Sequence, residues 1–248
     1  MVPDFPNVRT DSAREQARRF LAAQPDGGWL PPDQVAELLG SYGIPLVVTG
    51  SAASEDEAAR LAAEAAGPVV LKADVPGLAH RSDTGAVELD VRAADDVRAG
   101  YRRLVGRFGS RLQRVLIQPM ITDGTELTIG VASDPMFGPL VVVGIGGAAT
   151  DADHAARLTP LTDADADELI RSVGSAPLLL GHHGSAQTDI TALRSTLLRV
   201  SRLADELPEV AELELNPVIA RPDGVFTVDA RIRLAPAEPR DPFLRRLR

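Results

Sequence analysis

The residues best suited to chemistry stand between Pro68 and Val91, a stretch that reads PVVLKADVPGLAHRSDTGAVELDV. Lys72 follows a short apolar run, and a strand end would fix the direction of its side chain while leaving its charge reachable. The next segment, AHRSDTG, has the small and polar residues of a loop, whose backbone N–H groups and hydroxyls can bind an anion. The pattern predicts a phosphate clamp. A β-hairpin with a solvated loop and an interfacial lysine explains the same residues equally well.

A second cluster is rich in oxygen ligands. Glu212, Glu214 and Asn216 alternate in the run ELELNP, so a strand would place their side chains on one face. Asp229, on the next expected strand, could join them. The run contains no basic residue, and clustered carboxylates repel one another unless a positive charge lies between them. Carboxylate and amide oxygens suit Mg²⁺, so the sequence predicts a magnesium site. A solvent-facing strand edge is the alternative.

A glycine-rich segment, GIGGAA, follows the apolar run LVVV. Its letters match the dinucleotide fingerprint G-x-G-x-x-A, but no helix–strand continuation with an acid about twenty residues further on is evident. We therefore interpret Gly146 and Gly147 as part of a loop that approaches phosphates.

These side chains need a scaffold, and the periodicity of apolar residues predicts one. Helical spacing or capping signals indicate helices near 11–23, 33–39, 54–66, 97–108, 163–173 and 189–206. Apolar or alternating runs indicate strands at 46–48, 69–72, 87–91, 115–118, 126–131, 140–143, 211–215 and 225–228. Strands that follow one another without strict strand–helix alternation are typical of an α/β or mixed α+β fold.

Composition narrows the class of protein. The chain has 248 residues, which suits one or two domains, and its formal net charge of −9 argues against nucleic acid as a partner. It has no cysteine, which excludes disulfides, thiolate metal sites and a thiol nucleophile. No apolar run approaches the ~18 residues of a membrane span, and no signal peptide opens the chain, so we expect no membrane partner and a cytoplasmic location.

The order of short motifs resembles the ATP-grasp domain of NDP-forming acyl-CoA synthetases, the β-subunit type related to succinyl-CoA synthetase. The motifs run through about residues 33–235, and they are YGIP, PVVLK, HRSDTGAVEL, IQPM, GTELTIGV, DPMFGP, GIGG, RLTPL, ELELNP and VDARIRL. The GGWLPP segment and the final PRDPFLRRLR are similar to the last domain of bacterial multidomain acyl-CoA synthetase or acetyltransferase chains. The resemblance implies an ATP-grasp fold with two subdomains and a nucleotide cleft between them. Its parts would be an N-terminal tail and helix (1–32), a small α/β subdomain (33–115), a large subdomain (116–235) and a tail (236–248).

The resemblance also implies roles for single residues. Lys72 would contact the nucleotide phosphates, Gln118 to Met120 would form the hinge beside adenine, and Glu126 would bind the ribose hydroxyls. Asn216 and Asp229 would hold Mg²⁺ with support from Glu214.

His80 aligns with a histidine that carries phosphate between two active sites in the ADP-forming acetyl-CoA synthetases. A neutral imidazole nitrogen is a competent phosphoryl acceptor. Ser82 could donate a hydrogen bond to that phosphate, and Gly85 would let the backbone approach it. The segment after Gly147 departs from the family, because it is about two residues shorter and has Asp151 where Glu is common.

The implied reaction exchanges acyl-CoA, ADP (or GDP) and phosphate for a carboxylate, CoA and ATP (or GTP). This chain would supply the nucleotide half with Mg²⁺. A CoA-binding α-type domain or subunit would be its partner, through which a small-molecule carboxylate and CoA are bound. Two alternatives stay open. One is a regulatory nucleotide-binding domain of a protein acetyltransferase, and the other is a stand-alone ATP-grasp carboxylate–amine ligase.

Overall fold

The computed structural model describes residues 3–76, 84–134, 136–146, 154–182 and 186–237. The chain divides into two compact units, which we call the small unit (47–122) and the large unit (1–46 with 123–248). This division differs from the expected subdomains at 33–115 and 116–235. The helix at 32–41 packs with the large unit, and the strand at 114–119 pairs within the small one.

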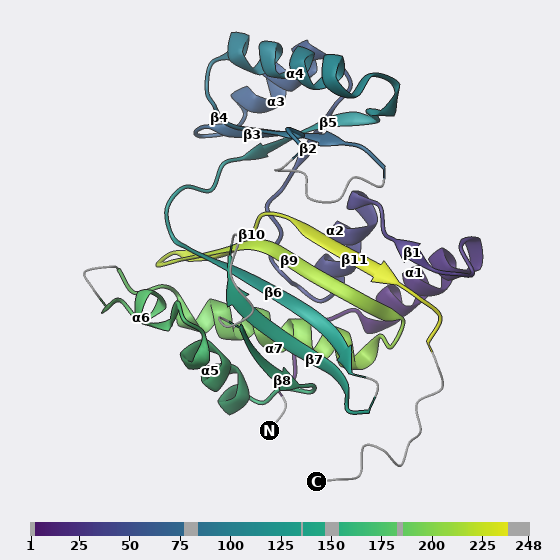
Figure 1. Ribbon diagram of the computed structural model, residues 1–248, viewed down its shortest axis with the longest axis vertical. Coiled ribbons are helices and arrows are strands. Elements are labelled where there is room, and N and C mark those ends of the chain that lie inside the picture. Colours follow the sequence, from purple (N-terminus) through teal and green to yellow (C-terminus); the bar gives the residue numbers. More distant parts are fainter. Residues whose placement is uncertain (1–2, 77–83, 135, 147–153, 183–185, 238–248) are drawn as a thin grey trace. The chain divides into compact units, whose positions relative to one another are not determined.

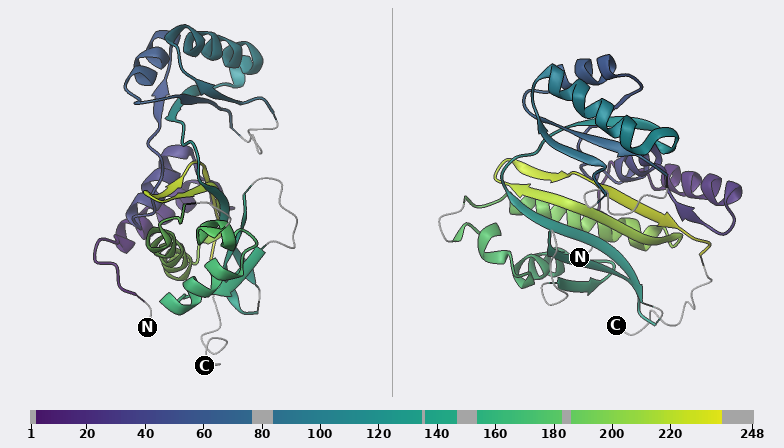
Figure 2. Two further views of the ribbon diagram at one scale, coloured as in Figure 1. Left: turned by 90° about the vertical axis from the view of Figure 1, so that its left-hand side faces the viewer. Right: turned by 45° about the horizontal axis from the view of Figure 1, so that its top comes forward.

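The small unit is a four-stranded antiparallel sheet with two helices on one face (Figure 2). Its strand order is β2-β5-β3-β4. The elements are β2 (Gly50–Ala52), α3 (Glu55–Ala63), β3 (Val69–Asp74), β4 (Val87–Val91), α4 (Ala94–Phe108), the 3₁₀ turn η1 (Gly109–Arg111) and β5 (Arg114–Pro119). The helix α3 begins where the sequence predicts, because the Ser54 side chain accepts a hydrogen bond from the Glu57 N–H at 3.2 Å.

The large unit is built on a seven-stranded sheet in the order β1-β11-β9-β6-β7-β8, with β10 also paired to β9 (Figure 1). All of these strand pairs are antiparallel. Its strands are β1 (Gly28–Trp29), β6 (Thr125–Asp134), β7 (Gly138–Ile145), β8 (His154–Leu158), β9 (Val210–Arg221), β10 (Gly224–Thr227) and β11 (Ala230–Leu234). Its helices are α1 (Thr10–Ala23), α2 (Pro32–Ser41), α5 (Asp163–Ser172), α6 (Ala176–Leu179) and α7 (Ile190–Glu206).

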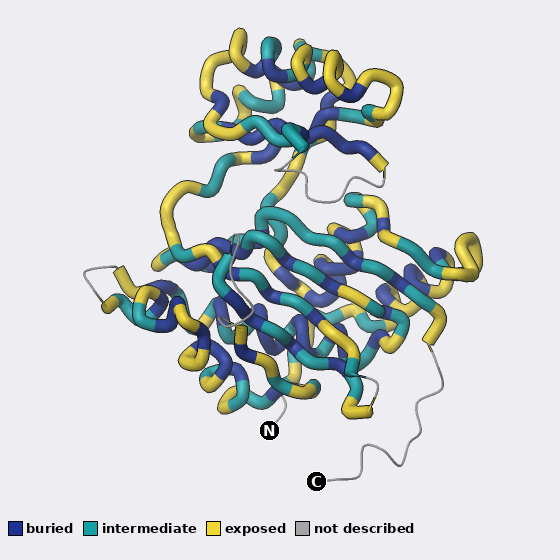
Figure 3. Tube along the Cα trace, viewed as in Figure 1, coloured by how far each residue is buried: buried dark blue, intermediate teal, exposed yellow. Residues whose placement is uncertain are grey.

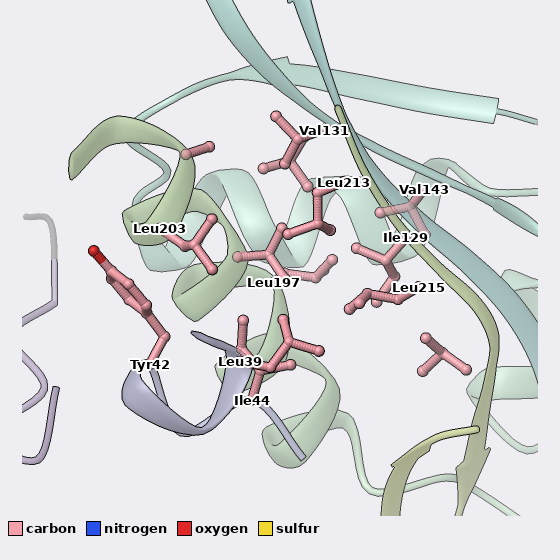
Figure 4. Packing of buried hydrophobic residues seen from close by; sticks show 14 of the residues in the cluster. Leu39, Tyr42, Ile44, Ile129, Val131, Val143, Leu197, Leu203, Leu213 and Leu215 are labelled. Atoms are coloured by element: carbon pink, nitrogen blue, oxygen red, sulfur yellow. The ribbon is translucent and has the colours of Figure 1, made fainter. Parts of the chain in front are cut away.

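One face of the large sheet forms the main hydrophobic core. Alternate residues of its central strands, such as Ile129 on β6 and Leu215 on β9, are fully buried against Leu197 of α7 and Leu39 of α2 (Figure 4). The residues between them are half-buried or exposed, which gives the strands of Figure 3 their alternating colours. The large sheet therefore has an apolar face covered by helices and an opposite polar face.

Helices packed on antiparallel sheets confirm the mixed α+β fold class predicted from the sequence. Within the described ranges, no helix is both long enough and apolar enough to cross a bilayer.

Candidate functional site

Lys72 lies inside a strand and not at its end. β3 continues to Asp74, and Lys72 pairs with Leu116 of β5 and Val87 of β4. Its neighbours Leu71 and Ala73 pack in the core beneath α3 and α4, so the alternation of the strand places Lys72 on the opposite face of the small sheet. The residue is only 6% exposed. Two expectations for Lys72 were therefore wrong: the residue does not end its strand, and its side chain is not exposed.

Gln118 shares that face of the small sheet with Lys72. It lies on β5 opposite Val70, two positions along β3 from the lysine. The Gln118 side-chain amide donates hydrogen bonds to the Thr49 hydroxyl at 3.0 Å and the Val47 carbonyl at 3.3 Å. Met120 follows the strand, and its backbone N–H donates to the Pro68 carbonyl at 2.8 Å. The predicted hinge residues are thus held on both sides of β5, by the segment that precedes β2 and by the residue that precedes β3.

Part of the predicted phosphate clamp lies outside the described residues, namely His80, Ser82 and Gly147. Gly85 is described and adopts a φ of 65°, in the left-handed region that favours glycine. A Cβ at this position would lie 2.5 Å from a guanidinium nitrogen of Arg107, so the backbone and the arginine approach closely there.

The predicted residues of the large unit gather on the polar face of its sheet. Glu126 lies on β6 beside Leu127, which is fully buried on the opposite face. Gly146 follows β7 and donates its backbone N–H to the Glu126 carbonyl at 2.9 Å. A Cβ on Gly146 would stand 2.8 Å from the Glu126 Cβ, so glycine is what allows this close approach. A Cβ on Gly144 would meet the imidazole of His154 on β8 in the same way.

Asn216 and Asp229 are brought together by strand pairing. Asn216 donates its backbone N–H to the Asp229 carbonyl at 2.9 Å, and the register of β9 and β11 makes them cross-strand partners. Side chains of such partners lie on the same face, about 4.5–5.5 Å apart at Cβ. Glu214 is two residues from Asn216 on the same face, and its carboxylate accepts a hydrogen bond from the Asn216 side-chain amide at 3.0 Å. The Asp229 carboxylate also accepts from the Ala230 N–H at 2.9 Å.

The positive charges between the carboxylates come from the protein itself. Arg231 on β11 pairs with Glu214 at 2.5 Å, and Arg233 pairs with Glu212 at 2.8 Å. The argument that these carboxylates need a metal ion between them to avoid repulsion was therefore wrong. Within the described ranges, no group of three His, Asp or Glu side chains is arranged to hold a metal ion.

The remaining oxygens still fit Mg²⁺. Glu214 occupies the NH₂ branch of the Asn216 amide, so the Asn216 Oδ1 can act as an acceptor on the face that Asn216 shares with Asp229. Hard cations such as Mg²⁺ use one or two carboxylates together with water and substrate phosphate oxygens. Asn216 and Asp229 are therefore suited to be direct ligands, and Glu214 to support them from behind.

Arg231 and Arg233 were not identified from the sequence as partners of the carboxylates. The contact of the Trp29 ring with the Arg231 guanidinium was not predicted either. A signal was available for the arginines, because ARIRL alternates with the same period as ELEL. Opposite charges at matching positions on two neighbouring strands indicate cross-strand ion pairs. The contact of Trp29 required β1 to be placed beside β11, which no local pattern indicated.

Curated relatives match most of this chain. The β subunit of ADP-forming acetate–CoA ligase I from Pyrococcus furiosus is 35% identical over 208 residues, which cover 81% of this chain and 90% of that subunit. The ADP-forming acetate–CoA ligase I from Archaeoglobus fulgidus is 36% identical over 234 residues, which cover 92% of this chain and 34% of that longer protein. The chain thus spans nearly all of the separate β subunit and about a third of the single-chain ligase.

Solved structures match the fold. The acetyl-coenzyme A synthetase 1 from Ca. Korarchaeum cryptofilum, in complex with coenzyme A, Ca-AMPCP and HgCl⁺, aligns with a TM-score of 0.81 and 36% identity, over 88% of this chain and 99% of that chain. The same enzyme with coenzyme A and Mg-AMPPCP, its phosphohistidine segment pointing towards the nucleotide binding site, aligns with a TM-score of 0.77 and 35% identity, over 90% of this chain and 99% of that chain. A family model described as an ATP-grasp domain matches residues 21–234. The family model and the relatives identify the same family, and the fold agrees with it. The chain therefore belongs to the ATP-grasp domain family.

Proposed function

We propose that this chain is the nucleotide-binding component of an ADP-forming acyl-CoA synthetase. In that role it exchanges phosphate between ATP and a carrier histidine during the interconversion of acyl-CoA, ADP and phosphate with carboxylate, CoA and ATP. The observation that carries the proposal is the position of the expected ligand residues. In each unit they share the sheet face opposite the helices, in a chain related to ADP-forming acetate–CoA ligases over nearly the whole β subunit.

In the large unit, Asn216 and Asp229 are the proposed metal ligands and Glu214 orients Asn216. Mg²⁺ held there would neutralise charge on the nucleotide phosphates. Glu126 is exposed on the same face and is proposed to accept hydrogen bonds from the ribose hydroxyls. Gly146 leaves open the space beside it, because a side chain at that position would collide with Glu126.

In the small unit, Lys72 is proposed to bind the nucleotide phosphates. An ammonium group forms charge-assisted hydrogen bonds to phosphate oxygens, which suits it to this role. Gln118 and Met120, at the end of β5, are proposed to line the adenine. The Gly85 backbone is proposed to approach phosphate, where its positive φ makes glycine the favoured residue.

His80 is the proposed phosphate carrier, and Ser82 and Gly147 complete the proposed phosphate contacts; all three lie outside the described residues. The imidazole nitrogen would attack the γ-phosphorus, the bond to the β–γ bridging oxygen would break, and ADP would leave. The phosphoryl group would then pass to the carboxylate, and CoA would displace phosphate from the acyl phosphate. This sequence of steps consumes one ATP and releases ADP and phosphate.

The acyl and CoA steps need a partner. The P. furiosus relative is named as a subunit, which supports an α-type partner for this chain, whereas the A. fulgidus relative is a single longer chain. We propose that a CoA-binding α-type protein or domain supplies the carboxylate and CoA sites, and that this chain alone makes no acyl-CoA.

The test is transfer of label from γ-labelled ATP to the chain in the presence of Mg²⁺ and the α-type partner. We expect an acid-labile, base-stable label on the wild type and none on His80→Ala. His182→Ala is the matched control, and it should take up label as the wild type does. An unlabelled wild type that still binds ATP would contradict phosphate transfer and favour a regulatory nucleotide-binding domain. Label on His80→Ala would assign the carrier role elsewhere.

A further inference from the structure

The strongest unexplained feature of the polar face is a row of side chains that runs inward from an exposed tryptophan. Trp29 lies on β1, the edge strand beside β11 (Figure 1), and is 46% exposed. The centre of its ring is 5.0 Å from the Arg231 guanidinium carbon. The register places Trp29 opposite Arg233, so Arg231 is its diagonal neighbour on the same face.

The row continues from Arg231 to a proposed magnesium ligand. Arg231 donates to one Glu214 carboxylate oxygen at 2.5 Å, and the other oxygen accepts from the Asn216 amide nitrogen at 3.0 Å. Trp29, Arg231, Glu214 and Asn216 therefore form a continuous series of contacts across three neighbouring strands. Asn216 and Glu214 already have proposed roles at the magnesium site, whereas Trp29 and Arg231 have none.

Each contact in this row restricts the next. A carboxylate can only accept hydrogen bonds, so Glu214 selects the NH₂ branch of the Asn216 amide and directs the Oδ1 away from itself. Arg231 holds Glu214 in that position and offsets its charge. The ring of Trp29 attracts the guanidinium through a cation–π interaction and so restricts its position.

We propose that Trp29 is a positioning residue for the magnesium site, and that it acts through Arg231 and Glu214 on the direction of the Asn216 Oδ1. Partners of this kind, which contact a ligand but not the metal, typically change metal affinity by about 10–100-fold when removed. Trp29 is two contacts further out, so its effect is smaller. This inference rests on the proposed function, because it assumes that Asn216 binds Mg²⁺.

Trp29 is also the one tryptophan in the sequence, so its fluorescence reports on this row without interference. The test is a titration of the full chain with Mg²⁺ at saturating ADP, read by calorimetry for every protein and also by tryptophan emission for those that retain Trp29. We expect Trp29→Ala to weaken apparent Mg²⁺ affinity about two- to five-fold, and Trp29→Phe, which retains a ring, to restore most of it. ADP affinity measured in EDTA should be the same for all three proteins.

Phe137→Ala is the matched control. Phe137 is 59% exposed in the turn between β6 and β7, so its removal deletes a comparably exposed aromatic side chain away from the row. This variant should leave Mg²⁺ affinity unchanged. Should Trp29→Ala fold poorly, Trp29→Leu preserves apolar volume and should show the same loss of Mg²⁺ affinity.

A double-mutant cycle with Arg231→Met tests whether Trp29 affects Mg²⁺ affinity through Arg231. If Trp29 acts through Arg231, then Trp29→Ala has no further effect on Mg²⁺ affinity once Arg231 has been replaced, and the emission of Trp29 in Arg231→Met no longer responds to Mg²⁺. Additive effects, or equal Mg²⁺ affinity for wild type and Trp29→Ala, would overturn the inference. Failure of the wild type to bind ADP with Mg²⁺ would instead contradict the proposed function.

Discussion

At the scale of single residues, the polar face of β9 and β11 separates two kinds of carboxylate. Glu212 and Glu214 are each paired with an arginine of the neighbouring strand. The Asp229 carboxylate accepts a hydrogen bond from the Ala230 N–H, and the Asp229 backbone carbonyl accepts one from the Asn216 N–H. We propose that Asp229 is the carboxylate that holds the cation, while Glu212 and Glu214 fix its surroundings through their arginine pairs.

Lys72 can be tested without disturbing the small unit. Methionine fills most of the space of the lysine stem and lacks its charge, so Lys72→Met should fold normally. We expect it to reduce affinity for ATP by about tenfold or more, and therefore to reduce the ATP-dependent rise in melting temperature, which follows the ratio of ligand concentration to Kd.

Arg102→Met is the control for that measurement. It also replaces a cation of the small unit with methionine, but Arg102 lies on the surface of α4 in an ion pair with Glu55. Its ATP-dependent rise should equal that of the wild type. An equal rise for Lys72→Met would remove Lys72 from the nucleotide site.

The sequence indicated which residues are candidates for the site better than it indicated their burial and their partners. Lys72, Asn216 and Asp229 could be singled out because their side chains suit phosphate and Mg²⁺. The burial of Lys72 could not be predicted, because the strand runs three residues beyond its apolar run, to Asp74. The pairing of Glu214 with Arg231 depends on the register between two strands that the sequence did not assign to one another.

At the scale of elements, hydrogen bonds join the turn after α2 to α7. Arg199 of α7 donates to the Tyr42 carbonyl at 2.7 Å and lies 4.3 Å from the centre of the Phe5 ring. Burial lowers the pKa of Arg199. The Tyr42 hydroxyl donates to Glu206 at the end of α7, and burial raises the pKa of that hydroxyl, reinforced by the Glu206 charge.

Gly43 is the residue that allows this arrangement. Its φ is 64°, and a Cβ there would lie 2.5 Å from a guanidinium nitrogen of Arg199. Gly43→Ala should lower the free energy of unfolding by about 1–3 kcal/mol, because the left-handed backbone alone costs alanine about 1–2 kcal/mol. Urea denaturation measures this change.

Gly40 provides the matched comparison. It lies inside α2, three residues earlier, and a Cβ there would meet nothing within 4 Å. Gly40→Ala should therefore stabilise the protein by about 0.5–1 kcal/mol. If Gly43→Ala is as stable as the wild type, the left-handed backbone and the contact with Arg199 do not constrain this turn.

Most helices and strands followed from the sequence, because their apolar periods are strong and several have clear caps. The predicted helices at 163–173 and 189–206 correspond to α5 and α7, and capping side chains Thr162 and Asp189 begin them. The division into units did not follow from local patterns. Whether α2 packs on the large or the small unit depends on long-range contacts that a helical period does not specify.

At the scale of the whole molecule, the two units provide different parts of the proposed chemistry. The small unit has the lysine and the residues proposed to line adenine, and the large unit has the oxygen ligands for Mg²⁺. The chain is similar both to a separate β subunit and to about a third of a longer ligase.

The most direct test of the central claim is a calorimetric titration of the full chain with ADP, first with Mg²⁺ and then with EDTA. The account predicts one ADP bound per chain, and an affinity that falls about tenfold or more in EDTA and to a similar extent in Asp229→Asn. Glu212→Gln, which removes a carboxylate paired with Arg233 on the same face, should bind like the wild type. No binding of ADP, or equal affinity with Mg²⁺, with EDTA and in Asp229→Asn, would contradict the account.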